Sequence, residues 1–158
     1  MKLVGLLLSL CLVVSPVRAE EPAQLSFGQH IYLPIYSHML YGNRSKTRAL
    51  PKALLSALVS IRNTDPKRSL RVLSARYYDT HGKFLQAYIS GSVVVAPFAT
   101  AELFVDMHDE SGGSGANFLI RWESDAPMNP PLIEALHANM DSGKAVILTT
   151  RGVPLRLD

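Results

Sequence analysis

Short runs in which apolar and polar side chains alternate recur along most of this sequence, and they restrict the possible folds more than any other feature. Residues 54–63 show the pattern most clearly, with apolar residues at four odd-numbered positions: Leu55, Ala57, Val59 and Ile61. Successive side chains of a strand point to opposite faces, so this alternation is typical of a strand with one buried face. Leu58 alone breaks the pattern here, because it is apolar on the polar face. The chain is therefore expected to fold mainly as β-sheet.

Comparable patterns predict further strands along the chain. They lie at residues 30–37, 70–78, 83–89, 93–96, 100–107, 117–124, 145–150 and 153–157. Within these runs, Trp122 falls on an apolar face and is expected in the core, whereas Phe104 is an apolar outlier on a polar face. Pro34 cannot donate a ladder hydrogen bond, so the first run is predicted to be an edge strand. Residues 41–52, which contain Gly, Asn, Pro and several basic residues, are expected to form a loop.

Residues 129–140 fit two secondary structures. Asn129 could cap a helix with Pro130 in its first turn, and Leu132, Leu136 and Met140 recur at helical spacing. The same residues also alternate acceptably as a strand between strands, and this interpretation is preferred. A helix remains the alternative for this segment.

Many short strands at regular spacing, without a sustained helical pattern, favour an all-β fold. We expect an antiparallel, immunoglobulin-like β-sandwich, with a small β-barrel as the alternative. The first 19 of the 158 residues have the features of a secretory signal. Without them the chain would have 139 residues, which suits one domain with a real core. The prediction is therefore a single domain.

The first 19 residues have the features of a cleavable secretory signal. Lys2 is followed by an apolar run over residues 3–14, and small side chains at Val17 and Ala19 predict cleavage after Ala19. Residues 20–28 are then expected to be a flexible leader, and residues 29–158 the β-sandwich domain. The sequence thus predicts a periplasmic or secreted bacterial protein with no transmembrane segment in the mature chain.

Charge and cysteine content restrict the possible partners of the mature chain. Of the 16 basic residues, Lys2 and Arg18 lie in the predicted signal, which leaves 14 basic against 13 acidic residues. Such balance gives no electrostatic footprint for nucleic acid or for an anionic membrane face. Cys11 also lies in the signal, so a mature chain cleaved after Ala19 would form no disulfide.

A polar, glycine-rich segment over residues 106–117 lies between two predicted strands and is the best candidate for a binding site. Glycines can bring several backbone N–H groups to one point, an arrangement that binds anions. The candidate ligand-binding residues are Asp109, Glu110, Ser111, Gly112, Gly113, Ser114 and Asn117. The alternative is a tight connecting loop in which Asp109 and Asn117 bond to nearby backbone groups.

Metal binding and acyl-transfer chemistry are two further possibilities for the same segment. His108 and Asp106, beside further carboxylates, offer ligands for a metal ion, although their spacing matches no diagnostic metal motif. Ser114 has Gly112 two residues before it, but Ala116 replaces the second glycine that a nucleophile elbow needs. The sequence therefore predicts no catalytic residues and no cofactor.

Four tyrosines form another group with possible binding chemistry: Tyr32, Tyr36, Tyr77 and Tyr78. If they share a face, they could form a platform for a sugar or a peptide. Otherwise they are cross-strand packing pairs, which is the commoner role of such residues.

Several segments together resemble a bacterial secreted family catalogued as domain of unknown function 3124. They are residues 32–38 (YLPIYSH), 60–65 (SIRNTD), 77–79 (YYD), 111–118 (SGGSGANF) and 129–135 (NPPLIEA). The resemblance covers essentially the whole mature chain. It implies a secreted or periplasmic location and a β-rich domain, and it implies no particular chemistry.

The sequence leads to two functional hypotheses. The first is an exported, non-enzymatic module that binds an extracytoplasmic protein partner or a small ligand through residues 106–117. The alternative is periplasmic metal-ion binding through His108, Asp106 and the acidic residues beside them.

Overall fold

The computed structural model describes residues 24–46, 49–140, 143 and 145–156. The predicted signal peptide and most of the predicted leader lie outside these residues. Within the described part of the chain the secondary structure is β, apart from one short 3₁₀ turn, η1 (Gly113–Gly115). No helix among these residues is long and apolar enough to cross a membrane.

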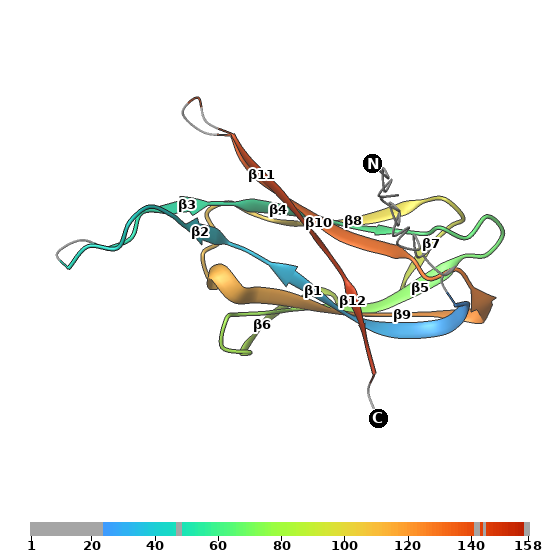
Figure 1. Ribbon diagram of the computed structural model, residues 1–158. Coiled ribbons are helices and arrows are strands. Elements are labelled where there is room, and N and C mark those ends of the chain that lie inside the picture. Colours follow the sequence, from blue (N-terminus) through green and yellow to red (C-terminus); the bar gives the residue numbers. More distant parts are fainter. Residues whose placement is uncertain (1–23, 47–48, 141–142, 144, 157–158) are drawn as a thin grey trace, which may run out of the picture.

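The described residues form two antiparallel sheets that pack face to face (Figure 1). The first sheet consists of β12 (Val153–Leu155), β1 (Ser26–Ile35), β9 (Ala116–Met128), β5 (Leu70–Tyr78) and β6 (Phe84–Ile89), in that order, with β7 (Val93–Val95) also paired to β5. The second sheet has the order β11 (Val146–Arg151), β10 (Leu132–Asn139), β4 (Ser56–Arg62) and β8 (Thr100–Val105). The strands form two open sheets and not one closed sheet, so the prediction of a β-sandwich is confirmed and the barrel alternative is wrong.

The alternation in the sequence produces the core between the sheets. Inward-facing side chains include Ile31 and Leu33 of β1, Val59 of β4, and Phe118 and Trp122 of β9, all of which are buried. Trp122 is among the largest fully buried side chains, as its place in the pattern predicts. Each such aliphatic or aromatic side chain contributes roughly 1.5 to 3 kcal/mol through its burial.

A projecting hairpin extends the sandwich at one end (Figure 1). It consists of β2 (His38–Leu40) and β3 (Lys52–Leu54), which continue β1 and lead into β4. The backbone N–H of Tyr41 donates to the carbonyl oxygen of Pro51 at 3.1 Å beyond the paired strands. Much of the predicted loop over 41–52 thus forms the end of this hairpin.

The C-terminal strand passes from one sheet to the other. β11 pairs with β10 of the second sheet, and β12 pairs with β1 of the first. Gly152 joins them, and its N–H donates to the carbonyl oxygen of Ile133 at 2.9 Å. A side chain at this position would collide with Cγ2 of Ile31, so the crossing requires glycine.

The structure corrects two expectations about β1 and confirms one about β10. β1 begins at Ser26, inside the segment 20–28 expected to be a leader. It has β9 on one side and β12 on the other, so the prediction of an edge strand is wrong. The carbonyl oxygen of Pro34 accepts from Oγ1 of Thr150 at 2.7 Å, so the backbone polar groups of Pro34 face away from β9. β12 pairs only with residues 30–32 on that side, so no ladder hydrogen bond is required from Pro34. The strand interpretation of residues 129–140 is confirmed by β10.

The turn between β4 and β5 is a buried hydrogen-bonding centre. Nδ2 of Asn63 donates to the carbonyl oxygens of Arg68, Val95 and Ala96 at 2.8 to 3.0 Å. The neighbouring Asp65 accepts backbone N–H groups through both carboxylate oxygens. These bonds, led by the one from the Lys67 N–H, lower the pKa of Asp65 from its usual value.

Candidate functional site

The acidic half of the predicted site forms two small turns that connect β8 to η1. Oδ1 of Asp106 accepts the backbone N–H of His108 at 2.8 Å, and Oδ1 of Asp109 accepts the backbone N–H of Ser111 at 3.0 Å. Glu110 instead forms an ion pair with Lys52 of β3. These side chains therefore bond within the loop or to the projecting hairpin, as the alternative interpretation of a tight connection expects for Asp109.

The glycine-rich half is packed against the rest of the protein. The carbonyl oxygen of Gly112 accepts both the N–H and the hydroxyl of Thr80, at 2.9 and 3.0 Å. The carbonyl oxygen of Gly113 accepts the N–H of Ser37 at 3.0 Å, and the N–H of Gly115 donates to Oγ1 of Thr80 at 3.0 Å. Several backbone groups of this segment thus hold the loop onto the residues between β1 and β2 and onto the β5–β6 turn.

Gly112 and Gly113 are needed for two different reasons. A Cβ at Gly112 would overlap the hydroxyl of Tyr77, which approaches the loop from β5 and lies 3.1 Å from Oγ of Ser37. Gly113 has a φ of 76°, in the left-handed region that favours glycine. These glycines therefore have a structural role in docking the loop.

The remaining predicted ligand-binding residues do not converge on one point. Ser114 is exposed in η1 and makes no hydrogen bond within the described part of the chain. Asn117 belongs to β9 and is paired with Pro34 on one side and Tyr78 on the other. The structure thus separates Asn117, on a strand of the first sheet, from the carboxylates of the loop.

The predicted metal ligands form a pair at the surface. Nδ1 of His108 lies 3.3 Å from Oδ1 of Asp106, and both side chains are largely exposed. The pKa of the Asp106 carboxyl is lowered, mainly because the carboxylate accepts the backbone N–H of His108. Across the residues with described positions, no group of three or more His, Cys, Asp or Glu side chains is placed to hold a metal ion. The pair alone provides fewer ligands than a metal site ordinarily has.

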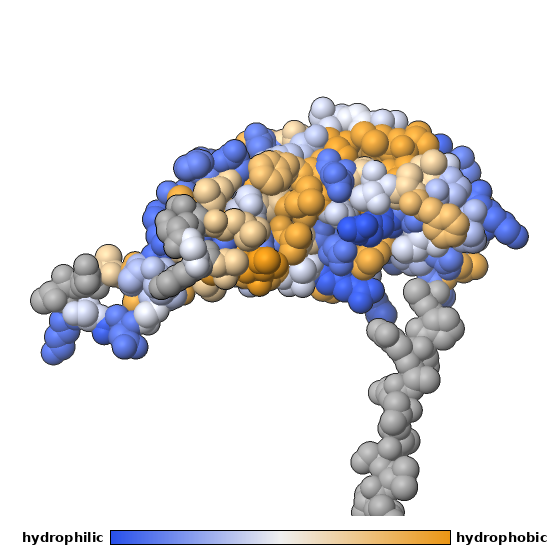
Figure 2. Space-filling view, turned by 90° about the horizontal axis from the view of Figure 1, so that it is seen from above, coloured by the Kyte–Doolittle hydropathy of each residue, from blue (hydrophilic) through white to orange (hydrophobic). Residues whose placement is uncertain are grey.

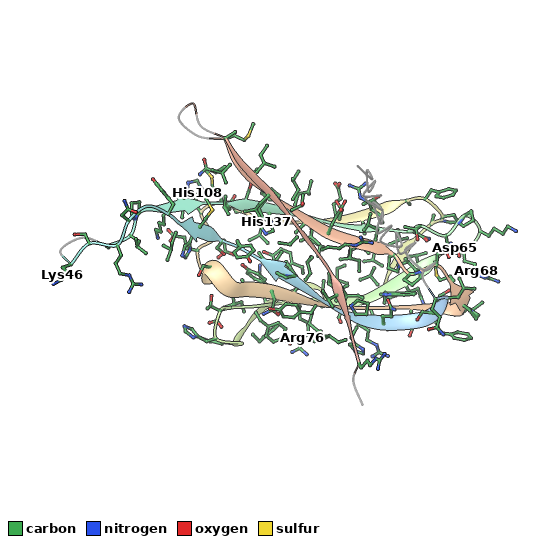
Figure 3. The ribbon with its side chains drawn as sticks, in the orientation of Figure 1. Lys46, Asp65, Arg68, Arg76, His108 and His137 are labelled. Carbon is green, nitrogen blue, oxygen red and sulfur yellow. The ribbon has the colours of Figure 1, made fainter. Side chains whose placement is uncertain are left out.

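Asp106 and His108 nevertheless lie beside an open groove of about 450 Å³. Its lining residues are Ser56, Phe104, Asp106, Met107, His108, Ala138 and Met140. The labelled side chain of His108 lies at the upper surface, near the base of the projecting hairpin (Figure 3). Asp106 and His108 were identified from the sequence, whereas Ser56 and Phe104 were not.

The groove continues into an apolar strip on the outer face of the second sheet. Leu58 of β4 is paired directly with Leu136 of β10 and with Phe104 of β8, so the three side chains form a row across the sheet. Phe104 is 56% exposed and Leu136 is 42% exposed. We define the apolar strip as Leu58, Phe104, Met107, Leu136, Met140 and Ile147. Figure 2, seen from the side of this sheet, shows apolar surface across the middle of the molecule.

A signal for the strip was present in the sequence. Leu58 and Phe104 are the two residues that break the alternation of their strands, and Leu136 belongs to the helical spacing that made residues 129–140 ambiguous. Each deviation is ordinary when taken alone. Only the strand pairing shows that these residues are neighbours.

The tyrosines do not form one platform. Tyr77 points into the core and stacks on Phe118 with ring centroids 4.9 Å apart. Tyr36 contacts the ring of His137 edge-on at 5.8 Å. Tyr32 and Tyr78 both take outward positions of the first sheet, on β1 and β5. Packing therefore accounts for Tyr77, and two of the four tyrosines share an exposed face.

Comparisons with known proteins assign no activity to the chain. A crystal structure described as Thermotoga maritima 1070 is similar to the chain, with 12% sequence identity, a TM-score of 0.45, and coverage of 85% of this chain and 96% of that one. Among curated proteins, none matches this sequence. Residues 28–155 match the family described as "Protein of unknown function (DUF3124)". The chain belongs to this family.

Proposed function

We propose that this protein is an exported, non-enzymatic binding module, and that the apolar strip with its groove binds an apolar segment of a protein partner. The single observation that carries the proposal is the row formed by Leu58, Phe104 and Leu136, which is continuous with the groove at residues 106–108. Export rests on the predicted signal peptide, and the absence of a catalytic group rests on the sequence interpretation of Ser114.

The composition of the strip supports a protein partner. Contiguous exposed apolar surface on a soluble domain commonly marks an interaction site, and polar side chains surround this strip. Met107 and Met140, which line the groove, have flexible and polarizable side chains that adapt to different apolar partners. The groove volume lies within the roughly 300 to 1,000 Å³ typical of binding sites.

The charge at one end of the strip specifies the partner further. Asp106 lines the groove, is 67% exposed at its side chain, and its lowered pKa keeps it ionised at neutral pH. Among the described residues, His108 is the one side chain that forms a hydrogen bond or ion pair with Asp106. A partner segment with apolar side chains followed by a basic residue would complement this arrangement.

The experiment compares three forms of the mature chain as bait in a periplasmic extract. We expect wild type and Leu25→Ser to retain one partner, which mass spectrometry identifies, and Phe104→Ser to lose it. Leu25 is a matched control, because it is 55% exposed and lies outside the strip. Calorimetry with the purified partner should then show a loss of affinity of roughly tenfold for Phe104→Ser.

Two results would contradict the proposal. Equal capture by all three forms would show that the strip makes no contact. A concentration-dependent dimer in light scattering that Phe104→Ser abolishes would show that a second copy of the chain, rather than another protein, covers the strip.

A further inference from the structure

The outer face of the first sheet carries a group of arginines and aromatic rings on neighbouring strands. We call it the arginine–aromatic face and define it as Tyr32, Arg76, Tyr78, Phe84 and Arg121. Leu119 of β9 is paired with Tyr32 of β1 on one side and with Arg76 of β5 on the other. Arg121 lies two residues farther along β9 on the same face. Cross-strand register therefore brings these side chains onto one exposed surface.

Arg76 is held over two of the rings. Its guanidinium carbon lies 4.7 Å from the ring centre of Phe84 and 6.0 Å from that of Tyr78, and these two rings contact each other edge-on at 5.8 Å. In Figure 3 the labelled Arg76 extends below the first sheet, away from the core. Stacking on aromatic rings orients a guanidinium group while leaving its N–H groups available.

The charges of Arg76 and Arg121 are not neutralised by the described residues. Neither side chain forms an ion pair in that part of the chain, although both are exposed. Arg71, which lies on β5 with Arg76, is neutralised instead: its guanidinium nitrogen lies 3.0 Å from a carboxylate oxygen of Glu123 and 2.8 Å from one of Asp125. The face thus has a local positive charge, although the predicted mature chain is nearly neutral.

The strands beneath this face restrict what can bind there. β1, β9 and β5 each have a neighbouring strand on both sides at these residues, whereas β6, which carries Phe84, is at the edge of the sheet. A peptide that added a strand would need free backbone groups at an edge, and this face offers side chains only. The polar groups near the arginines include His30 of β1, which is paired with Arg121, together with the Tyr32 hydroxyl, Ser74 and Asn117. Rings, hydroxyls and guanidinium groups on one exposed face suit a chain of sugar rings with carboxylates.

We propose that the arginine–aromatic face binds an acidic polysaccharide. Its carboxylates bond to Arg76 and Arg121, for which arginine has the matching two-point geometry, and its sugar rings lie against Tyr32 and Phe84. This site goes beyond the proposed function, because it lies on the opposite sheet from the apolar strip. A protein with both sites would hold a protein partner against a polysaccharide layer outside the cell membrane.

The test measures binding of the mature protein to polygalacturonate and hyaluronate, with neutral dextran and poly-glutamate as comparison polymers. We expect saturable binding to at least one acidic polysaccharide and none to dextran. Arg76→Gln and Arg121→Gln should each weaken that binding by roughly tenfold, because each loses a charge-assisted bidentate contact. Arg76→Lys should also weaken it, since lysine keeps the charge without the planar fork.

Matched controls separate this site from general electrostatics and from misfolding. Lys46→Gln and Lys67→Gln remove the same charge outside this face and should leave the affinity unchanged. Thermal unfolding of each variant must match that of wild type before its affinity is compared. Phe104→Ser should bind polysaccharide normally, so failure of the proposed function does not affect this result.

Three outcomes would overturn the inference. One is binding to neither acidic polysaccharide. A second is equal binding to poly-glutamate with the same dependence on Arg76 and Arg121, which would indicate an acidic peptide ligand. A third is an equal loss in the lysine control variants, which would reduce the effect to net charge.

Discussion

The backbone N–H of Tyr36 donates a hydrogen bond to Nε2 of His137 at 3.2 Å, and this bond joins the end of β1 to the second sheet. His137 is fully buried between the sheets (Figure 3), and its Nδ1 has no hydrogen-bond partner in the described part of the chain. Because Nε2 accepts, the proton of the neutral ring is on Nδ1. Protonation would add a hydrogen to Nε2, which could then no longer accept the bond from the Tyr36 N–H.

Stability should therefore decrease in mild acid. Burial lowers the pKa of His137 below its usual value of about 6.5, so below that pH the unfolded chain binds a proton that the folded chain does not. The free energy of unfolding is expected to fall as the pH decreases from about 6.5 towards the folded-state pKa. Urea unfolding between about pH 5 and 7.5 measures it, and His137→Gln should flatten this part of the profile. An unchanged slope in His137→Gln would assign the effect to other groups, and His108→Asn is the exposed control.

The buried turn after β4 should be sensitive to loss of a single amide. Asn63→Ala removes the donor shared by three carbonyl oxygens and the acceptor of the Asp65 N–H, at a residue that is 2% exposed. Of the three oxygens, that of Ala96 keeps its bond from the Ala99 N–H. We expect the free energy of unfolding to decrease by about 3 kcal/mol, measured by urea titration. Ser69→Ala, at an exposed position of the same turn, should stay within about 0.5 kcal/mol of wild type. A small effect for Asn63→Ala would show that water replaces the amide.

Two glycines provide a test of how the candidate loop is docked. Gly112→Ala should destabilise the protein by roughly 2 kcal/mol, because its Cβ would overlap the Tyr77 hydroxyl and force the loop away from β5. Gly91→Ala is the control, because a Cβ there would meet no atom within 4 Å beyond its chain neighbours, and the φ of Gly91 is not positive. Thermal unfolding distinguishes the two. Equal stability of the variants would mean that the loop is free to move.

Metal binding at His108 and Asp106 stays a prediction of the sequence interpretation that can be tested directly. Since these two side chains form a pair without a third ligand in the described residues, we expect calorimetric titration with copper, zinc and calcium to give no saturable heat. Saturable heat that His108→Asn removes would establish the metal site. It would also require the loop to rearrange.

Much of the fold could be predicted because alternation reports which face of a strand is buried. The strand predicted at residues 70–78 coincides with β5, and Trp122 lies in the core as expected. The extent of β1 was harder to predict, since Ser26 enters the sheet through its pairing with Met128 of β9, across a register shift, and not through its own pattern. Strand order is a property of the whole chain, so Pro34 alone could not show that β12 covers part of β1.

The candidate site was predictable only in part for the same reason. Asp106 and His108 were identified from their chemistry, and both lie at the groove. Leu58 is 46 residues from Phe104 and 78 residues from Leu136 in the sequence. Only the pairing of β4 with β8 and β10 makes the three side chains one surface. The glycine-rich segment shows the reverse case. Its sequence permits a flexible loop, whereas the structure packs the segment against Thr80 and Ser37.

The crossing of the C-terminal strand at Gly152 has a consequence for how the protein is made. β11 completes one side of the second sheet and β12 completes one side of the first, so neither layer is whole until residues 146–155 have left the ribosome. Many pairings also join distant parts of the chain, which slows folding. Slow folding would suit the export that we propose, because an exported chain crosses the membrane before it folds.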